Sequence, residues 1–171
     1  IMIGCFMVYL ALFRYDYYQK KSNLSLLFFL IIFFPIVTSV IVSNNLFSVY
    51  AVPFAMLPMI IRIFLDSRTA FMAHIVSIML CSILLRTPHE FILLQTVAGI
   101  VSIHSLRELS QRSQLMRSAL FIFMSYSLTY LSLDLIHVGE IEQLSTQMYI
   151  LFGVNAILLL FTYPLLFILE K

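Results

Sequence analysis

The stretch LSLLFFLIIFFPIVTSVIVS, residues 24–43, decides the fold class, because it runs for a full membrane-spanning length without a charged side chain. A helix needs about 20 apolar residues to cross the hydrocarbon core of a bilayer. The whole chain of 171 residues is 62% hydrophobic and 11% charged, whereas a soluble globular domain carries about 25% charged residues. This composition excludes a soluble domain and a disordered chain. The apolar runs are continuous and do not alternate in period two, which favours a helix bundle over a β-barrel.

Six other apolar stretches approach the same length, which predicts an all-α transmembrane bundle of seven spans. The seven stretches are 1–13, 24–43, 49–65, 70–85, 91–106, 118–136 and 147–169. The first is short, and the chain opens on IMIGCFMVYLALF without a basic segment, so we expect a truncated first span in a fragment and not a signal peptide. The connections are short, which predicts antiparallel neighbours and a single domain over residues 1–171.

The basic residues predict the orientation, since they are retained on the cytoplasmic side of short loops. If the first connection is cytoplasmic, only Arg86 lies on the other side. The basic residues on the cytoplasmic side are then Arg14, Lys20, Lys21, Arg62, Arg68, Arg107, Arg112, Arg117 and Lys171. The N-terminus is therefore predicted outside and the C-terminus in the cytoplasm.

Prolines and glycines predict where these helices bend or approach closely. The prolines within the spans are Pro35, Pro53, Pro58 and Pro164. Each removes a backbone donor and favours a bend, above all in the third span, although proline is also ordinary in membrane helices. Gly99 and Gly153 predict close helix packing.

Several ionisable residues gather where the third and fourth spans meet, in the sequence MLPMIIRIFLDSRTAFMAH, residues 56–74. Arg62, His74 and His104 are expected at one depth, in the inner third of the membrane. One interpretation is a snorkelling arginine and two histidines at wet helix ends. The other is an inward-facing polar cluster that binds an anion or a helix end, or passes on a conformational change.

Polar residues deeper in the spans are few, and Gln95 and Asn155 are the main candidates. Hydrogen bonds between helices explain most such residues. Asp134 lies near the outer end of the sixth span and either faces an outer vestibule or reaches the interface.

Enzyme signatures are absent from the sequence. It has no HExxH, GxSxG or phosphate-binding loop, and no cysteine pair at zinc spacing. The four histidines alternate between the two predicted sides, so they cannot form one metal site. We therefore expect this chain to have no catalytic residues, no cofactor and no metal of its own.

Three separated stretches carry a resemblance to a known family. They are YAVPFAMLPMIIRIFLDSRTAFMAHIVSIMLC (50–81), FILLQTVAGIVSIHSLRELSQRSQLMRSALFIFMSYSLTYLSLDLI (91–136) and NAILLLFTYPLLFILEK (155–171). In this order they resemble the membrane region of bacterial seven-transmembrane receptors with an intracellular HD hydrolase domain, especially Bacteroidetes members. The FxDSRxA junction, the QRSQL loop and the closing PLxxxLEK are the most specific parts. Gln111 departs from the basic residue usual at the start of that loop.

The resemblance implies a sensor that anchors and regulates an HD phosphodiesterase in the bacterial cytoplasmic membrane. In that family an extracytoplasmic domain precedes this region, and an HD domain follows it that hydrolyses cyclic di-AMP with two metal ions. The implied partners are the lipid bilayer and those two domains, with a homo-oligomer left open and no nucleic acid. The DSRT turn and the QRSQL loop would form the docking surface for the hydrolase. The candidate signalling or docking residues are Arg62, Asp66, Arg68, His74, His104, Arg107 and Arg112.

Two alternatives come from other classes of membrane protein. One is a small transport subunit similar to the substrate-binding components of vitamin importers, which would need intramembrane polar residues at broken helices. The other is a structural anchor without a ligand.

Overall fold

A computed structural model describes residues 1–106, 112–138 and 146–169, and 86% of these residues are helical, with no strand among them. The elements are α1 (Met2–Phe13), α2 (Tyr15–Gln19), α3 (Lys21–Asn44), η1 (Val49–Ala51), α4 (Met56–Phe64), α5 (Ser67–Ser82), α6 (Pro88–Ser105), α7 (Arg112–Val138), α8 (Thr146–Leu159) and α9 (Thr162–Leu169). The prediction of an all-α fold is confirmed.

Each of the seven apolar stretches is helical, but two of them are broken. The third stretch divides into η1 and α4, and Pro53 lies in the break. The seventh divides into α8 and α9 just before Pro164. Pro58 and Pro164 each stand third in their helices, where a missing N–H costs little because no intrahelical acceptor exists for it.

Pro35, by contrast, does not break its helix, because α3 continues through it from Lys21 to Asn44. Proline cannot donate to the carbonyl four residues earlier, which here belongs to Ile31. That carbonyl accepts a long hydrogen bond of 3.5 Å from the hydroxyl of Ser77 on α5. The proline thus frees an acceptor that joins α3 to α5.

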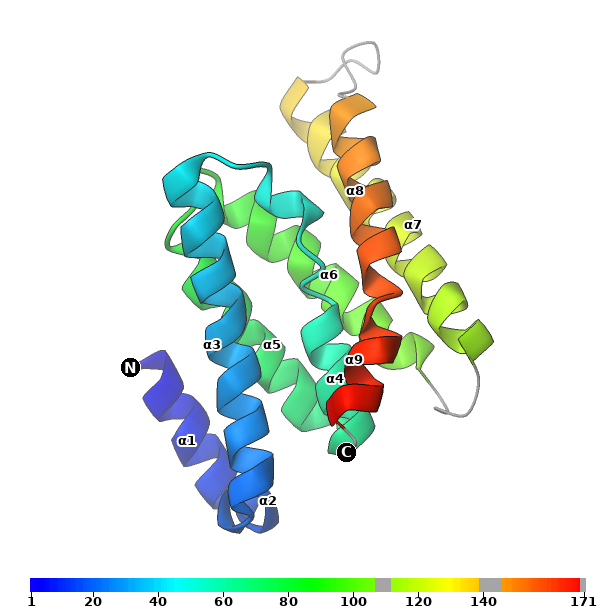
Figure 1. The fold of residues 1–171 in the computed structure, drawn as a ribbon. Helices are drawn as coiled ribbons and strands as arrows, with labels where there is room; N and C mark the ends of the chain where they lie inside the picture. Colours follow the sequence, from blue (N-terminus) through cyan, green and yellow to red (C-terminus); the bar gives the residue numbers. More distant parts are fainter. Residues whose placement is uncertain (107–111, 139–145, 170–171) are drawn as a thin grey trace.

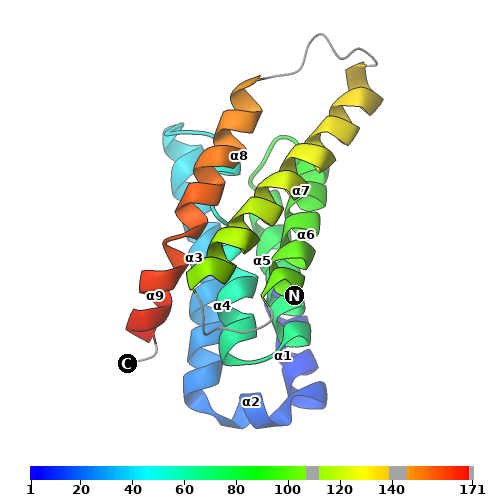
Figure 2. The same ribbon diagram turned by 90° about the vertical axis from the view of Figure 1, so that its right-hand side faces the viewer.

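The bundle is arranged around the broken third stretch (Figures 1 and 2). Helix α5 packs against α1, α3, α4 and α6, and α6 then packs against α7, which packs against α8. Helix α4 also contacts α6, α3 and α9, while η1 contacts α8. Successive long segments run in opposite directions, as the short connections predict (Figure 1).

Aromatic side chains fill the interior around the break. The ring centroid of Phe54, which lies in the break, is 5.3 Å from that of Phe34 on α3 and 5.1 Å from that of Phe91 on α6. On the other side of the bundle, Tyr126 of α7 stacks on Phe152 of α8 at 5.2 Å. The break is therefore packed within the core and is not a surface irregularity.

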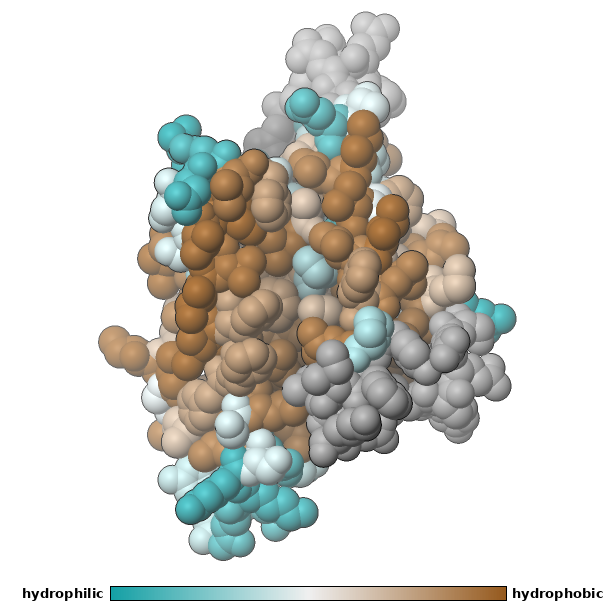
Figure 3. Space-filling view, viewed as in Figure 1, coloured by the Kyte–Doolittle hydropathy of each residue, from teal (hydrophilic) through white to brown (hydrophobic). Residues whose placement is uncertain are grey.

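On the face drawn in Figure 3 the surface is apolar between two hydrophilic ends. Within the described residues, three segments are long and apolar enough to cross a membrane, namely Lys21–Asn44, Leu115–Ile136 and Thr146–Leu166. Met2–Phe13 and Val49–Phe64 are shorter apolar segments. Phe29, Ile36, Leu120 and Ile157 are among the apolar side chains exposed on this surface. A lipid bilayer would cover such an apolar surface and keep it out of water. Seven membrane spans and the orientation of the termini stay predictions.

Candidate functional site

The charged end of the bundle, where α2, the α4–α5 turn and the end of α9 lie (Figures 1 and 2), is organised by Asp66. The carboxylate of Asp66 caps α5 by accepting a hydrogen bond of 3.1 Å from the backbone N–H of Arg68. The same oxygen forms an ion pair of 2.7 Å with Arg14, which stands between α1 and α2. The charge of Asp66 raises the pKa of the Arg14 guanidinium. Asp66 therefore connects the junction of α1 and α2 to the start of α5.

Arg14 was not among the predicted site residues. Its connection is predicted on the same side of the membrane as Asp66, which is the only signal that the sequence offers. Lys20 and Lys21 share that connection, and nothing in the pattern distinguishes Arg14 from them.

Arg62, at the end of α4, holds the end of another helix. Its Nε donates a hydrogen bond of 3.0 Å to the carbonyl of Leu106, the residue that follows α6. Carbonyls at a helix C-terminus have no partner within the helix, and a cation there also complements the helix dipole. A contact with a helix end is thus present at Arg62, as one part of the second interpretation allows.

The two candidate histidines do not share one environment. His104 is exposed, and its Nδ1 lies 2.9 Å from the carbonyl of Ile100 on its own helix. His74 is fully buried, and its Nε2 donates a hydrogen bond of 2.9 Å to the carbonyl of Gln95 on α6. The expectation of a wet helix end is wrong for His74, because the α5–α6 interface covers it.

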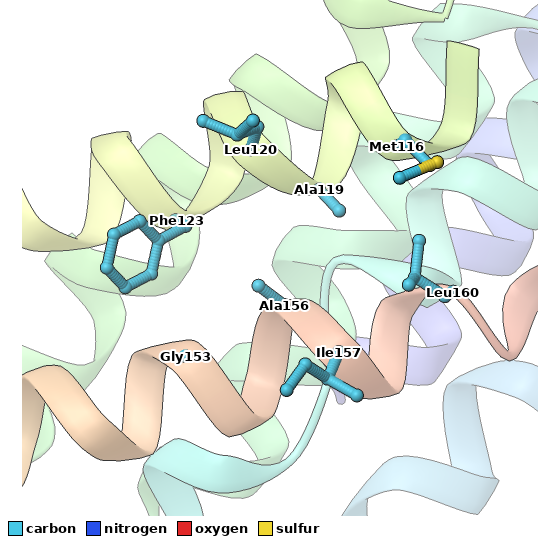
Figure 4. A pocket seen from close by; sticks show the side chains of 8 residues that line it. All are labelled: Met116, Ala119, Leu120, Phe123, Gly153, Ala156, Ile157 and Leu160. Carbon is cyan, nitrogen blue, oxygen red and sulfur yellow. The ribbon is translucent and has the colours of Figure 1, made fainter. Parts of the chain in front are cut away.

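Gly99 makes this burial possible, whereas Gly153 has no such role. A Cβ atom at Gly99 would overlap Cδ2 of His74 and lie 2.5 Å from its Nε2, so the close packing predicted for Gly99 is confirmed. A Cβ atom at Gly153 would meet nothing within 4 Å. Gly153 lines an open groove between α7 and α8 (Figure 4), and the close packing predicted there is wrong.

Gln95 connects three helices in the buried interior. Its backbone carbonyl accepts from His74 on α5, and its side-chain Oε1 accepts a hydrogen bond of 2.5 Å from the hydroxyl of Tyr126 on α7. All three residues are at least 99% buried, with exposures of 0% for His74 and Gln95 and 1% for Tyr126. This contact is the hydrogen bond between helices that usually explains a polar residue such as Gln95 within a span. Tyr126 was not predicted as a polar candidate, because a tyrosine inside an apolar run is usually an ordinary core residue.

Asn155 closes the break in the third stretch. From α8, its Nδ2 donates hydrogen bonds of 3.0 Å to the carbonyl of Tyr50 and 2.7 Å to the carbonyl of Val52. Both carbonyls lie where the helix is interrupted, so they lack the partners that a continuous helix would supply. The sequence predicted a bend in the third span at Pro53 and Pro58 and a polar Asn155 deep in the seventh span, but it did not pair them.

The other candidate residues are not brought to these contacts. Asp134 is half-buried on α7, near the end of that helix away from the charged end (Figure 1). The side chain of Arg68 is exposed. Arg107 lies outside the described residues, and Arg112 begins α7 while its side chain lies outside the description. Among the residues that the structure describes, no three His, Cys, Asp or Glu side chains form a group that could bind a metal ion.

Removing the tyrosine hydroxyl tests the contribution of the Gln95 contact. We expect Tyr126→Phe to lower the stability of the full-length protein by about 1 kcal/mol, as for other hydrogen bonds between membrane helices. The ring of Phe would keep the stacking on Phe152, so the loss reports the hydroxyl alone. Thermal unfolding in lipid nanodiscs measures the effect, and an unchanged melting temperature would show that the bond contributes nothing.

Comparison with known protein families gives a match over the entire chain. The family described as 7TM receptor with intracellular HD hydrolase matches residues 1–171. Curated proteins and solved structures give no match. The family match agrees with the apolar surface and with the three sequence stretches that carry the resemblance. The chain therefore belongs to the family of 7TM receptors with an intracellular HD hydrolase, of which it is the membrane region.

Proposed function

We propose that this chain is the sensory and signal-transmitting domain that anchors and regulates a cytoplasmic HD phosphodiesterase acting on cyclic di-AMP. The family match over residues 1–171 carries this proposal. The proposal includes seven spans in the bacterial cytoplasmic membrane, with the N-terminus outside and the C-terminus in the cytoplasm. It also includes an extracytoplasmic domain before the chain and the HD domain after it. In this proposal the HD domain binds the two metal ions, as the resemblance implies.

The broken third stretch supports a route for transmission through the bundle. Its first part, η1, and the residue after it accept hydrogen bonds from Asn155 of α8. Its second part, α4, includes Arg62, which donates a hydrogen bond to the carbonyl at the end of α6. Asp66, which caps α5 after the short connection from α4, is paired with Arg14. Helix α4 also contacts α9, which leads to the charged end of the bundle (Figure 1). A shift of α4 relative to η1 would therefore change contacts at the face where the hydrolase would dock.

The alternative of a transport subunit is less well supported by the same break. A transporter built on a broken helix offers free backbone groups to its solute. Here the carbonyls of Tyr50 and Val52 are already bonded to Asn155. The family match also favours the receptor.

Replacing Asp66 by asparagine tests the docking surface. Asparagine is an equally good helix cap, but it removes the charge that pairs with Arg14, so we expect near-normal stability and altered regulation. In membranes that contain the full-length protein, Asp66→Asn should change the rate of cyclic di-AMP hydrolysis, or its response to a stimulus, severalfold. Asp16→Asn is the matched control, because Asp16 is exposed on α2 and should leave both unchanged.

The outcomes separate the parts of the proposal. Full-length protein that fails to hydrolyse cyclic di-AMP would contradict the substrate. Normal hydrolysis with no difference between the two variants would contradict the docking surface alone. Sequencing the gene past the codon for Lys171 is the first step, since a stop codon there would contradict the receptor arrangement and return attention to transport.

A further inference from the structure

A groove between α1 and α5 at the charged end of the bundle combines an apolar floor with two arginines. Its volume is about 290 Å³, close to the lower limit of known ligand pockets. It is lined by Tyr9, Phe13, Arg14, Arg68, Phe71 and Met72. The rings of Tyr9 and Phe13 stack at 5.7 Å along one wall, which gives the groove a continuous aromatic side.

The two arginines differ in what holds them. The guanidinium of Arg14 is paired with Asp66 at 2.7 Å, so much of its charge is balanced. The side chain of Arg68 is exposed, and among the described residues its guanidinium has no hydrogen bond or ion pair. The second carboxylate oxygen of Asp66, Oδ1, is buried without a partner. Asp66 carries one negative charge, so Arg14, Arg68 and Asp66 together have a net charge of one positive charge. The groove therefore fits a ligand with one negative charge.

The groove lies where the surface of the bundle changes from apolar to hydrophilic. Phe13 and Met72 are exposed, at 72% and 43%. Phe13 is the last residue of α1, directly before α2, and Met72 lies in the second turn of α5. A ligand there would meet hydrocarbon on one side and lipid headgroups on the other. Exposed Lys20 and Lys21 at the start of α3 make the same end basic, which attracts anionic lipids.

A second groove of similar size shows what the arginines add. The groove between α7 and α8 has a volume of about 320 Å³ and is lined only by apolar residues such as Met116, Phe123 and Leu160 (Figure 4). It offers no group that could select a headgroup. Any lipid chain could cover it, and it carries no specificity.

We propose that the groove between α1 and α5 binds one anionic phospholipid of the phosphatidylglycerol class. The phosphodiester lies on the guanidinium of Arg68, and an acyl chain lies against Phe13, Phe71 and Met72. A charged guanidinium beside an anionic phosphate is a strong, charge-assisted contact. A second protein chain in this position would instead have to bury Arg68 with a carboxylate of its own, at a substantial desolvation cost.

Native mass spectrometry of the full-length protein tests this site. The purified protein is exposed to phosphatidylglycerol or phosphatidylcholine, and the retained lipids are counted. One basic residue near an anionic surface contributes about 1 kcal/mol, which corresponds to about a fivefold preference. We expect Arg68→Gln to lower the preference for phosphatidylglycerol over phosphatidylcholine about fivefold. Arg117→Gln is the matched control, since Arg117 is also exposed but lies on α7, and it should retain the preference.

Two further measurements keep the test decisive. Phe13→Ala shortens the apolar wall, so it should reduce retention of both lipids while leaving their ratio nearly unchanged. Inorganic phosphate in excess should not displace the lipid, and displacement would show a site for a soluble anion instead. Equal loss in the Arg68 and Arg117 variants, or equal retention of both lipids by the unchanged protein, would overturn the proposal. None of these outcomes depends on the activity of a hydrolase.

Discussion

Replacing Gly99 by valine should destabilise the bundle more than any other single change considered. The new side chain would occupy the position of the His74 ring, which is fully buried and bonded to the carbonyl of Gln95. Overpacking a core costs about 1–3 kcal/mol of stability. Displacing the ring of His74 would also break the hydrogen bond from its Nε2 to the carbonyl of Gln95. We expect a loss at the upper end of this range or beyond, measured as thermal unfolding of the full-length protein in lipid nanodiscs.

Gly153→Val is the matched control for this change. It adds the same side chain to a helix of the same bundle, but a Cβ atom at Gly153 meets nothing within 4 Å. Its melting temperature should stay close to that of the unchanged protein. The double variant His74→Ala, Gly99→Val should be more stable than the sum of its single effects predicts, because alanine removes the clash. Equal stability of the two valine variants would contradict the close approach of α5 and α6.

Replacing Asn155 by leucine should produce the second large effect, because it removes the side-chain donor that two backbone carbonyls share. The carbonyl of Tyr50 would lose its hydrogen bond beside an apolar side chain, and that of Val52 would keep only its bond of 2.9 Å from the N–H of Phe54. An unsatisfied buried polar group costs about 1–3 kcal/mol, and the membrane offers no water to replace the lost donor. We expect a lower melting temperature in nanodiscs and, in membranes with the full-length protein, a weakened response of the hydrolase.

Asn44→Leu provides the comparison for Asn155. The amide of Asn44 also donates to a backbone carbonyl, that of Val40, at 2.8 Å. That bond is exposed and lies within α3, so its loss should change stability by less than about 0.5 kcal/mol. Similar losses for both variants would show that closing the break has no special importance.

The positions of the helices could be predicted from the sequence because the free energy of membrane insertion depends on the length and composition of each apolar run. All seven stretches are helical, and Pro53 marks the break in the third. The effects of Pro35 and Pro58 were not equally predictable. A proline bends a helix only where its missing donor and its ring disturb an existing turn, and Pro58 stands in the first turn of α4.

The contacts between helices were not predictable from the sequence in the same way. A helix that is apolar on all sides does not show which face meets its neighbours, so the pairing of Gln95 with Tyr126 and of Arg14 with Asp66 could not be read from periodicity. The same limit explains the opposite outcomes at Gly99 and Gly153. Both are glycines within apolar helices, and only the rotation of each helix decides whether a neighbour covers it.

The shortness of α4 has a consequence for how the bilayer acts on this domain. Helix α4 has nine residues and is about 14 Å long, less than half of the hydrocarbon thickness of about 30 Å. Helix α3 has 24 residues and is about 36 Å long, so a thinner bilayer makes it tilt, kink or thicken the lipid around it. Leu57 to Ile61 of α4 are all buried among other helices. Hydrophobic mismatch therefore acts on the outer helices and reaches α4 only through the side chains that enclose it.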